Sequence, residues 1–375
     1  MTASFRLGRI AGVQIGVNWS VLIIFGLIAW GLSAGRFPAA YPDQPWWAYL
    51  LAGGAAAVVF FVGLLAHEMS HALLARRNGI EVEGITLWMF GGVAQLRGEA
   101  RTPGAELRIA GVGPLVSVLI GLGFALVAGL LRVAGFGGLV VGAFGWLAGI
   151  NILLAVFNLI PAAPLDGGRL LRAGLWKLRG DRTWASVMAA RAGRIFGGVL
   201  IVLGVWSMLA TGDFGGLWLA LIGWFLLSAA TVEQQQARLA DALHGVRVGD
   251  VMSPDPETAP AGITVGDFVD RHLLSSRHSA FPLTEDGRPV GLVTLARIKR
   301  VPAEQRTATP LREVACPREE LTLASPEEPL IDLLPRLRGC ADGRALVVAG
   351  DGALVGIVSP SDISHAVQRA SLTHR

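Results

Sequence analysis

The chain has 375 residues, of which 53% are hydrophobic and 16% charged, and its mean hydropathy is +0.54. A soluble globular domain carries about 25% charged residues, so this composition excludes a chain built only of such domains. Residues 1–232 carry a net charge of +7 and residues 233–375 a net charge of −3. Because the basic excess lies in the apolar part, it indicates membrane topology, and we expect the lipid bilayer as a partner and no nucleic acid.

The chain begins with a predicted strand, followed by two apolar segments. Three β-branched residues alternate with polar or small residues within residues 6–17, which predicts a short strand at the membrane surface. Residues 17–34 carry no charge and are long enough to span a bilayer. A second span is predicted from about residue 47 to residue 75, and it starts at an aromatic pair, Trp46 and Trp47, typical of a membrane interface.

The second predicted span contains an HExxH motif, HEMSH, at residues 67–71. His67 and His71 lie one helical turn apart on one face, where two imidazoles can bind one zinc ion. Glu68 beside them can act as a general base toward water. The same pattern also occurs in soluble helices as a solvated polar face, but here the flanking residues are apolar on both sides. Ionisable groups in such a segment are costly, so we predict a metal site.

Residues 81–98 combine alternating apolar residues with several glycines. Phe90-Gly91-Gly92 separates two alternating stretches, which predicts a β-hairpin at the membrane interface. Open strand edges are not tolerated against lipid, so the hairpin must be covered by protein or line a cavity. The alternative is an ordinary cytosolic loop.

Four further apolar segments complete a predicted set of six transmembrane spans. They cover residues 109–131, a segment from about residue 140, residues 195–212 and residues 214–232, with a tight turn at Asp213.

The basic residues predict the orientation of these spans. Arg36 and Arg132 are the only Lys or Arg residues in the predicted outer connections of residues 1–232. The others lie in or beside the predicted inner segments. By the positive-inside rule, we expect a multi-pass protein of the inner (plasma) membrane with both termini in the cytoplasm.

A third metal ligand is expected, because catalytic zinc is bound by three protein side chains and keeps one position open. The fourth span ends in NLIPAAPLDGG, where two prolines break the helix and the glycines permit close backbone approach. Asp166 thus lies on a distorted segment at membrane depth, and it is the only acid between Glu106 and Asp181. These features make it the candidate ligand. Alternatively, Asp166 caps a helix starting at Gly167 or pairs with Arg169.

HEMSH in one span and NLIPAAPLDGG in a later one resemble the site-2 protease family of intramembrane zinc metalloproteases, over residues 1 to about 232. The resemblance implies one Zn2+ ion bound by His67, His71 and Asp166, with Glu68 as the catalytic base. Asn158 matches the family's asparagine ahead of the LDG motif; it orients substrate or stabilises the oxyanion, or it forms an interhelical hydrogen bond. The implied substrate is a transmembrane protein, such as an anti-sigma factor or another membrane-tethered regulator.

The C-terminal part contains an internal repeat with a period of about 65 residues. Residues 281–294 parallel residues 346–359, and each segment reads strand, turn, strand, then helix. This repeat resembles a tandem pair of CBS domains. The predicted domains are residues 1–232 (six-span protease), 233–245 (linker), 246–302 (CBS repeat 1) and 303–375 (CBS repeat 2).

The fold class predicted for the whole chain is a polytopic α-helical membrane protein with six transmembrane helices and a small membrane-associated β-sheet. A cytosolic α/β tandem CBS domain follows it.

The CBS resemblance implies an adenine nucleotide in the cleft between the repeats, and thereby regulation of the protease. In that family a serine or threonine and an aspartate contact the nucleotide, and they correspond to Ser359 and Asp362 in repeat 2. Repeat 1 has Arg297 at the aspartate position, so one nucleotide site is expected. Alternatively, Ser359 and Asp362 only cap the last helix, and the tail is a module that forms a homodimer.

The chain has two cysteines, Cys316 and Cys340, both in the C-terminal part. Two thiols in a chain of this length do not make a disulfide framework, so we expect them to be reduced.

The residues favour a zinc endopeptidase in which Glu68 takes a proton from water and passes it to the leaving amine. A CBS-regulated cation transporter or channel would also explain buried His and Asp residues, but it would not require Glu68. A third interpretation, an inactive CBS-regulated scaffold, predicts no bound zinc.

Overall fold

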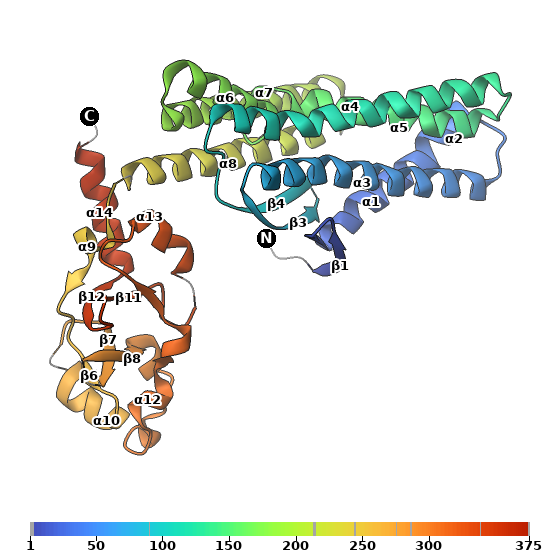
Figure 1. The fold of residues 1–375 in the computed structure, drawn as a ribbon. Helices are drawn as coiled ribbons and strands as arrows, with labels where there is room; N and C mark the ends of the chain where they lie inside the picture. Colours follow the sequence, from blue (N-terminus) through green and yellow to red (C-terminus); the bar gives the residue numbers. More distant parts are fainter. Residues whose placement is uncertain are drawn as a thin grey trace. The chain divides into compact units, whose positions relative to one another are not determined.

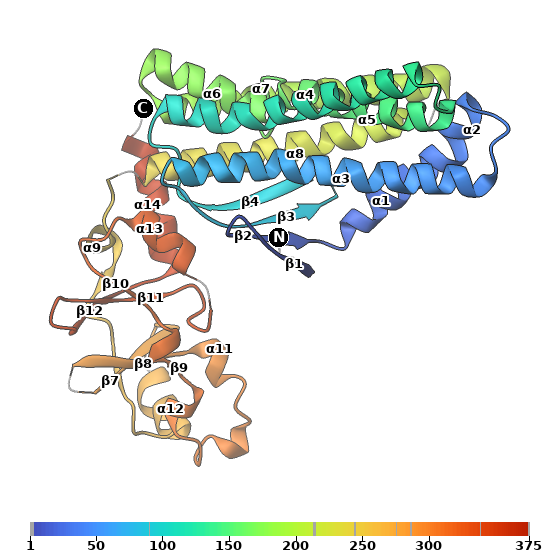
Figure 2. The same ribbon diagram turned by 45° about the vertical axis from the view of Figure 1, so that its right-hand side comes forward.

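The computed structural model describes residues 4–89, 91–212, 215–243, 245–274, 276–285, 287–337 and 339–373. The chain divides into two compact units, Met1–Ala237 and Arg238–Arg375. The first unit is helical with one small sheet, and the second contains two further sheets with short helices (Figures 1 and 2).

The first unit contains the six predicted spans, which confirms the fold class of this part. Large apolar side chains such as Leu126, Trp206 and Leu209 are exposed on these helices, as expected for surfaces that face lipid. Within the described residues, the helices long and apolar enough to cross a membrane are Ser20–Ala40 (α1 Ser20–Trp30, η1 Gly31–Arg36, α2 Phe37–Ala40), α3 Trp46–Arg77, α4 Pro103–Val133, α5 Gly138–Asn158, α7 Arg182–Thr211 and α8 Gly215–Ala242.

The fifth membrane-crossing helix, α7, is longer than the sequence predicts. It starts at Arg182 and not near residue 195, because Asp181 caps it by accepting a hydrogen bond from the amide of Trp184 at 2.8 Å. Arg36 and Arg132, predicted in connections, lie within η1 and in the last turn of α4. The predicted turn residue Asp213 lies outside the described residues.

The small sheet has the strand order β1-β2-β3-β4, and only β2 and β3 run parallel. The predicted hairpin is confirmed as β3 (Glu81–Trp88) and β4 (Gly91–Arg97), although Phe90 lies outside the described residues. The strand predicted within residues 6–17 is two strands, β1 (Phe5–Ile10) and β2 (Val13–Val17). Alternate apolar residues of β2 and β3 pack on α3, so the sheet lies along the helix that carries HEMSH.

The segment between α5 and α6 (Asp166–Arg179) is held by close backbone contacts. A Cβ atom at Gly167 would lie 2.2 Å from the carbonyl oxygen of Ile160, and one at Gly168 would lie 2.4 Å from the amide nitrogen of Ala163. On α7, a Cβ at Gly193 would lie 1.9 Å from the carbonyl oxygen of Ala163. Only glycine permits this approach, which sets the position of the first turn of α6.

The second unit contains the predicted repeat. Its two four-stranded sheets have the orders β10-β11-β12-β5 and β6-β7-β8-β9, so each repeat contributes one strand to the sheet of the other. Repeat 1 comprises α9 Val248–Val251, β5 Ser253–Pro254, β6 Ala259–Pro260, α10 Val265–Phe268, η2 Val269–Leu273, β7 Ala280–Glu285, β8 Arg288–Thr294 and α11 Leu295–Ile298. After η3 (Ala303–Gln305), repeat 2 comprises α12 Leu311–Val314, β9 Cys316–Pro317, η4 Arg318–Glu320, β10 Thr322–Ala324, α13 Leu330–Leu333, η5 Leu334–Arg336, β11 Ala345–Val348, β12 Leu354–Val358 and α14 Pro360–Thr373.

The two cysteines are bonded to each other, which contradicts the expectation of free thiols. Cys316 and Cys340 form a disulfide, and their Cα atoms are 5.5 Å apart, within the normal range. A count of cysteines does not predict this bond, because only the fold brings together two residues that are 24 positions apart.

Candidate metal centre

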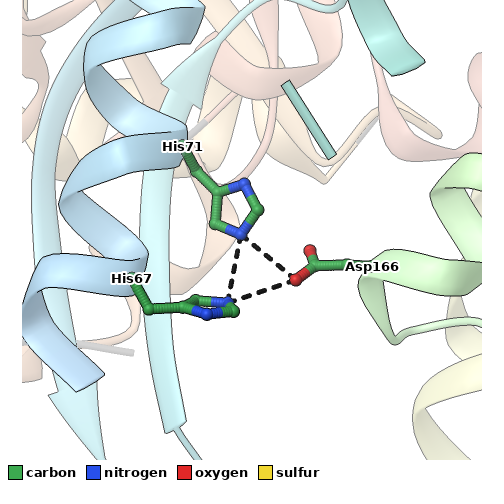
Figure 3. A group of neighbouring side chains, drawn as sticks. All are labelled: His67, His71 and Asp166. Atoms are coloured by element: carbon green, nitrogen blue, oxygen red, sulfur yellow. Dashed lines mark hydrogen bonds and ion pairs between the residues drawn. The ribbon is translucent and has the colours of Figure 1, made fainter. Parts of the chain in front are cut away.

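The three residues predicted to bind a metal have their side chains close together in the first unit (Figure 3). His67 and His71 point from α3 toward Asp166 at the start of α6. The Oδ2 atom of Asp166 lies 3.2 Å from Nε2 of His67 and 3.1 Å from Nε2 of His71, and the two Nε2 atoms are 3.2 Å apart. Both histidines are buried, with 2% and 7% of their surface exposed. Asp166 does not cap α6, because the helix begins at this residue without a side-chain cap.

The outer nitrogens of both rings have protein partners. Nδ1 of His71 donates to the carbonyl oxygen of Ile109 at 2.6 Å, and since a carbonyl only accepts, Nδ1 carries the proton. The Nε2 atom of the neutral ring then presents a lone pair to the Asp166 carboxylate. Nδ1 of His67 lies 2.9 Å from the hydroxyl of Ser117, whose oxygen can accept a hydrogen bond from the ring N–H. Such partners of the outer nitrogen are typical of metal-binding histidines.

The donor set fits a zinc ion in kind and in spacing. Two imidazole nitrogens and one carboxylate oxygen are the ligands of many hydrolytic zinc sites. Zinc–ligand bonds of 2.0–2.1 Å in a tetrahedron place the ligand atoms roughly 3.3–3.4 Å apart. The three separations of 3.1–3.2 Å are close to that value. Lone pairs at these distances repel one another, and a cation between them removes the repulsion.

A glycine of α4 leaves the space beside the three ligand atoms free. A Cβ atom at Gly113 would lie 2.1 Å from Nε2 of His71 and 2.7 Å from Nε2 of His67. Any other residue in place of Gly113 would therefore fill the space beside the two ligand nitrogens with its side chain. The same helix carries Ile109 and Ser117, one turn on either side of Gly113, so a single face of α4 forms this wall of the site.

Glu68 follows His67 on α3, and its side chain contacts the hairpin. A Cβ atom at Gly92 would lie 2.3 Å from Cγ of Glu68, so the backbone of β4 comes directly against this side chain. Both residues border a cavity of about 540 Å³ that also reaches His67, His71 and Asp166. Glu68 is half-buried, which allows contact with a water molecule or a substrate in the cavity.

The cavity is apolar apart from a few polar side chains. Asn158, at the end of α5, borders it, and the structure records no hydrogen bond of this side chain to another described residue. The interhelical hydrogen bond considered for Asn158 is thus not present among the described residues. Aromatic and aliphatic residues complete the wall, among them Trp88, Phe157, Trp218, Ile222, Phe225 and Leu226.

A buried ion pair joins α4 to α6. Arg172 donates from Nε to Oε1 of Glu106 at 2.8 Å, and its terminal nitrogen contacts the same oxygen. A second carboxylate, Glu233 of α8, lies 3.5 Å from Arg172. Burial alone would lower the pKa of the Arg172 guanidinium, but Glu106 raises this pKa above its ordinary value. The cation therefore holds α4 and α6 together, the two helices that flank the metal site.

Replacing Arg172 with methionine should destabilise the protein by roughly 3–5 kcal/mol, because Glu106, which is fully buried, would lose its partner. Thermal unfolding in detergent measures this loss. The double variant Glu106→Gln with Arg172→Met should regain most of the stability, since it removes both charges. Equal losses in the single and double variants would show that the pair does not link the helices.

Replacing Ser117 with alanine should weaken zinc binding by about 10- to 100-fold, because the outer nitrogen of His67 would lose its buried partner. Competition with a chromogenic chelator measures the affinity. Ser70→Ala is the matched control, since the Ser70 hydroxyl contacts the backbone oxygen of His67 and not its ring. A variant at Ser117 with unchanged zinc affinity would show that this hydroxyl does not position His67.

The two residues predicted to bind nucleotide lie in the second unit. Ser359 and Asp362 border a cavity of about 380 Å³. Oδ2 of Asp362 accepts hydrogen bonds from the amide of Ser359 at 2.8 Å and from its hydroxyl at 2.6 Å, as in a helix cap. The geometry is therefore compatible with nucleotide binding and with helix capping, the two roles predicted for these residues. In repeat 1, Arg297 donates to the carbonyl oxygens of Val314 and Ala315 at 2.6 and 3.2 Å.

Comparisons with known proteins identify the families of both parts of the chain. The model of peptidase family M50 matches residues 55–137 and 127–205, and the CBS-domain model matches residues 248–304 and 311–369. Rip3 of Mycobacterium tuberculosis, named as a zinc metalloprotease, is 44% identical over 98% of this chain and 93% of its own length. Zinc metalloprotease MJ0392 of Methanocaldococcus jannaschii is 28% identical over 98% of this chain and 97% of its own.

Among solved structures, the site-2 protease from Methanocaldococcus jannaschii is 29% identical, with a TM-score of 0.43 over 61% of this chain and 94% of that one. The identity to Rip3 over nearly the whole length of both proteins is sufficient to assign the family. The chain belongs to peptidase family M50, as a multi-pass membrane metalloprotease of the site-2 protease type with a C-terminal pair of CBS domains.

Proposed function

We propose that this protein is an intramembrane zinc endopeptidase in which His67, His71 and Asp166 bind the metal and Glu68 is the general base. The observation that supports this most directly is the triangle of ligand atoms with sides of 3.1–3.2 Å. A zinc ion held there would polarise a water molecule and the scissile carbonyl.

The side chains around the metal have separate tasks in this proposal. Glu68 takes the proton of the attacking water and returns it to the leaving amine, which general acid–base catalysis requires of one positioned carboxylate. Asn158 borders the same cavity, and its amide is available to hydrogen-bond the substrate carbonyl. The apolar wall keeps bulk water away from the reacting groups, which strengthens the electrostatic interactions among them.

The hairpin provides a surface for an extended substrate. A transmembrane helix hides its carbonyl groups in its own hydrogen bonds, so it must unwind before cleavage. β4 is the last strand of the sheet, and Gly91, Gly92 and Ala94 border the cavity beside Glu68. An unwound segment that pairs with β4 would present its backbone to Glu68 and the metal ligands.

The proposed setting is the inner (plasma) membrane, with both termini in the cytoplasm as the basic residues predict. The proposed substrate is a membrane-tethered regulatory protein, such as an anti-sigma factor, cut in or near its transmembrane segment. The CBS pair would bind one adenine nucleotide at Ser359 and Asp362, thereby regulate cleavage, and also join two chains as a homodimer.

Purified protein in liposomes tests the catalytic proposal. It should contain one zinc ion per chain and cleave at least one member of a set of single-span reporter proteins, and a membrane-permeant chelator should stop cleavage. The same liposomes, loaded with a zinc-sensitive dye, test the transporter alternative. Zinc uptake without cleavage would favour a transporter, and protein without zinc would favour an inactive scaffold.

A further inference from the structure

The disulfide of the second unit lies between its two sheets. Cys316 belongs to β9, which pairs with β8 through Leu292, and Cys340 lies in the loop before β11. Both cysteines pack in an apolar cluster with Leu346 and Ile357. The chain has no other cysteine, so neither residue has an alternative partner within the chain.

The residues after Cys340 form a short loop that ends at Arg344. The carboxylate of Asp342 accepts a hydrogen bond from the hydroxyl of Thr294 at 2.6 Å. Arg344 donates to the hydroxyl of Ser279 at 3.0 Å and to the carbonyl oxygen of Asp342 at 3.3 Å. The loop is thus attached to Cys316 by a covalent bond and to repeat 1 by single hydrogen bonds.

Arg344 borders the cavity of about 380 Å³ that also contains Ser359 and Asp362. Arg277 and His278 border the same cavity, so basic groups from both repeats face it. The carboxylates of Asp255, Glu257 and Asp362 border it as well. Arg guanidinium groups bind phosphate in a fixed geometry and carboxylates accept hydrogen bonds from hydroxyl groups, so this lining suits a ligand that carries both phosphate and hydroxyl groups. Because Arg344 ends the loop, the position of the loop decides whether the Arg344 guanidinium faces the cavity.

We propose that Cys316 and Cys340 form a thiol–disulfide redox site whose state sets the position of Arg344 in this cavity. With the disulfide formed, the loop from Gly339 to Arg344 is anchored to β9, and Arg344 is held ready for an anion. After reduction only hydrogen bonds retain the loop, and its conformational freedom increases. The choice of a nucleotide as the anion rests on the proposed function; the redox site itself does not.

The burial of the two sulfurs determines the course of reduction. Cys316 is fully buried and Cys340 is half-buried, so a small dithiol attacks the sulfur of Cys340. This forms a mixed disulfide with Cys340, and Cys316 leaves as a thiolate that takes up a proton. The second thiol of the reagent then displaces Cys340, and the reagent becomes a cyclic disulfide. Two electrons and two protons pass to the protein.

The reverse reaction needs an oxidant, for which we name hydrogen peroxide. The thiolate of Cys340 attacks one peroxide oxygen, which gives a sulfenic acid and hydroxide. Cys316 then displaces the second hydroxide and forms the disulfide, so that two waters are released in total. Because cytoplasmic thiols are kept reduced, the disulfide in the proposed orientation is the state formed under oxidative stress.

The full-length protein in nanodiscs tests the proposal without any substitution. Thiol titration under denaturing conditions should count two thiols after dithiothreitol and none after peroxide. Hydrogen exchange of residues 341–346 should then be about tenfold slower in the oxidised protein, while residues 265–268, the buried helix α10 of repeat 1, should not change. Two free thiols after peroxide, or equal exchange in both states, would overturn the proposal.

ATP and AMP serve as probes of the cavity. Preorganised Arg344 should make ATP bind about three- to tenfold more tightly to the oxidised protein, and the double variant Cys316→Ala with Cys340→Ala should lose this difference. Equal ATP affinity in the two states of the wild type would contradict the role of Arg344. If ATP and AMP bind in neither state, the proposed nucleotide function fails, and the exchange rates decide the redox site independently.

Discussion

The Glu68→Gln variant should keep one zinc ion per chain and lose cleavage by roughly 10²–10⁴-fold. Glutamine has nearly the same shape as glutamate, so the ligands His67 and His71 should stay in place. It cannot take a proton from water at neutral pH, and the attacking group is then not generated. Cleavage of a transmembrane reporter in liposomes and elemental analysis of the same sample measure the two properties together.

Glu81→Gln is the matched control for this change. Glu81 lies at the start of β3 and is exposed, so the same loss of one negative charge occurs away from the cavity. Its activity and zinc content should equal those of the wild type. A Glu68→Gln variant that cleaves as fast as this control would exclude Glu68 as the base, and one that has lost its zinc would instead assign Glu68 a role in metal binding.

The Gly113→Ala variant should fold and bind almost no zinc. The added methyl group would lie 2.1 Å from Nε2 of His71, 2.5 Å from its Cε1 and 2.7 Å from Nε2 of His67. These distances are far below van der Waals contact, so the two rings must turn away from each other and from Asp166. Zinc content and cleavage should fall together, whereas circular dichroism should show an unchanged helical content.

Gly123→Ala provides the control on the same helix. Gly123 lies farther along α4, and a Cβ at this position would have no atom within 4 Å apart from its chain neighbours and the backbone of its own helix. Both substitutions raise helix propensity by about 1 kcal/mol, so any difference between them reports the steric effect at the metal site. Normal zinc content in Gly113→Ala would mean that the metal does not lie beside this glycine.

The sequence predicted the elements with strong local signals. Six long apolar segments predicted six spans, since a bilayer requires long apolar helices, and alternation around Phe90-Gly91-Gly92 predicted the hairpin. His67 and His71 were found because their spacing alone places them on one face of a helix. Asp166 was identified from an acid among prolines and glycines in an apolar segment, although capping remained an alternative until the structure placed it beside the imidazoles.

Other parts of the metal site carry no local signal. Ser117 is a single hydroxyl in an apolar helix, and Gly113 is one glycine among 49. Nothing in their neighbours indicates that α4 lies against α3 at this height. The neighbouring sequence likewise gives no indication of the hydrogen bond to the carbonyl of Ile109 or of the ion pair between Glu106 and Arg172.

The sequence by itself thus determined the membrane class, the repeat and the identity of the candidate ligands, because each depends on the hydrophobicity, spacing or type of neighbouring residues. Only the tertiary structure decided which residues meet across helices: the partners of the imidazoles, the glycine at the metal site and the bond between Cys316 and Cys340. The physical reason is that these contacts depend on how distant segments pack, and packing leaves no regular pattern along the chain.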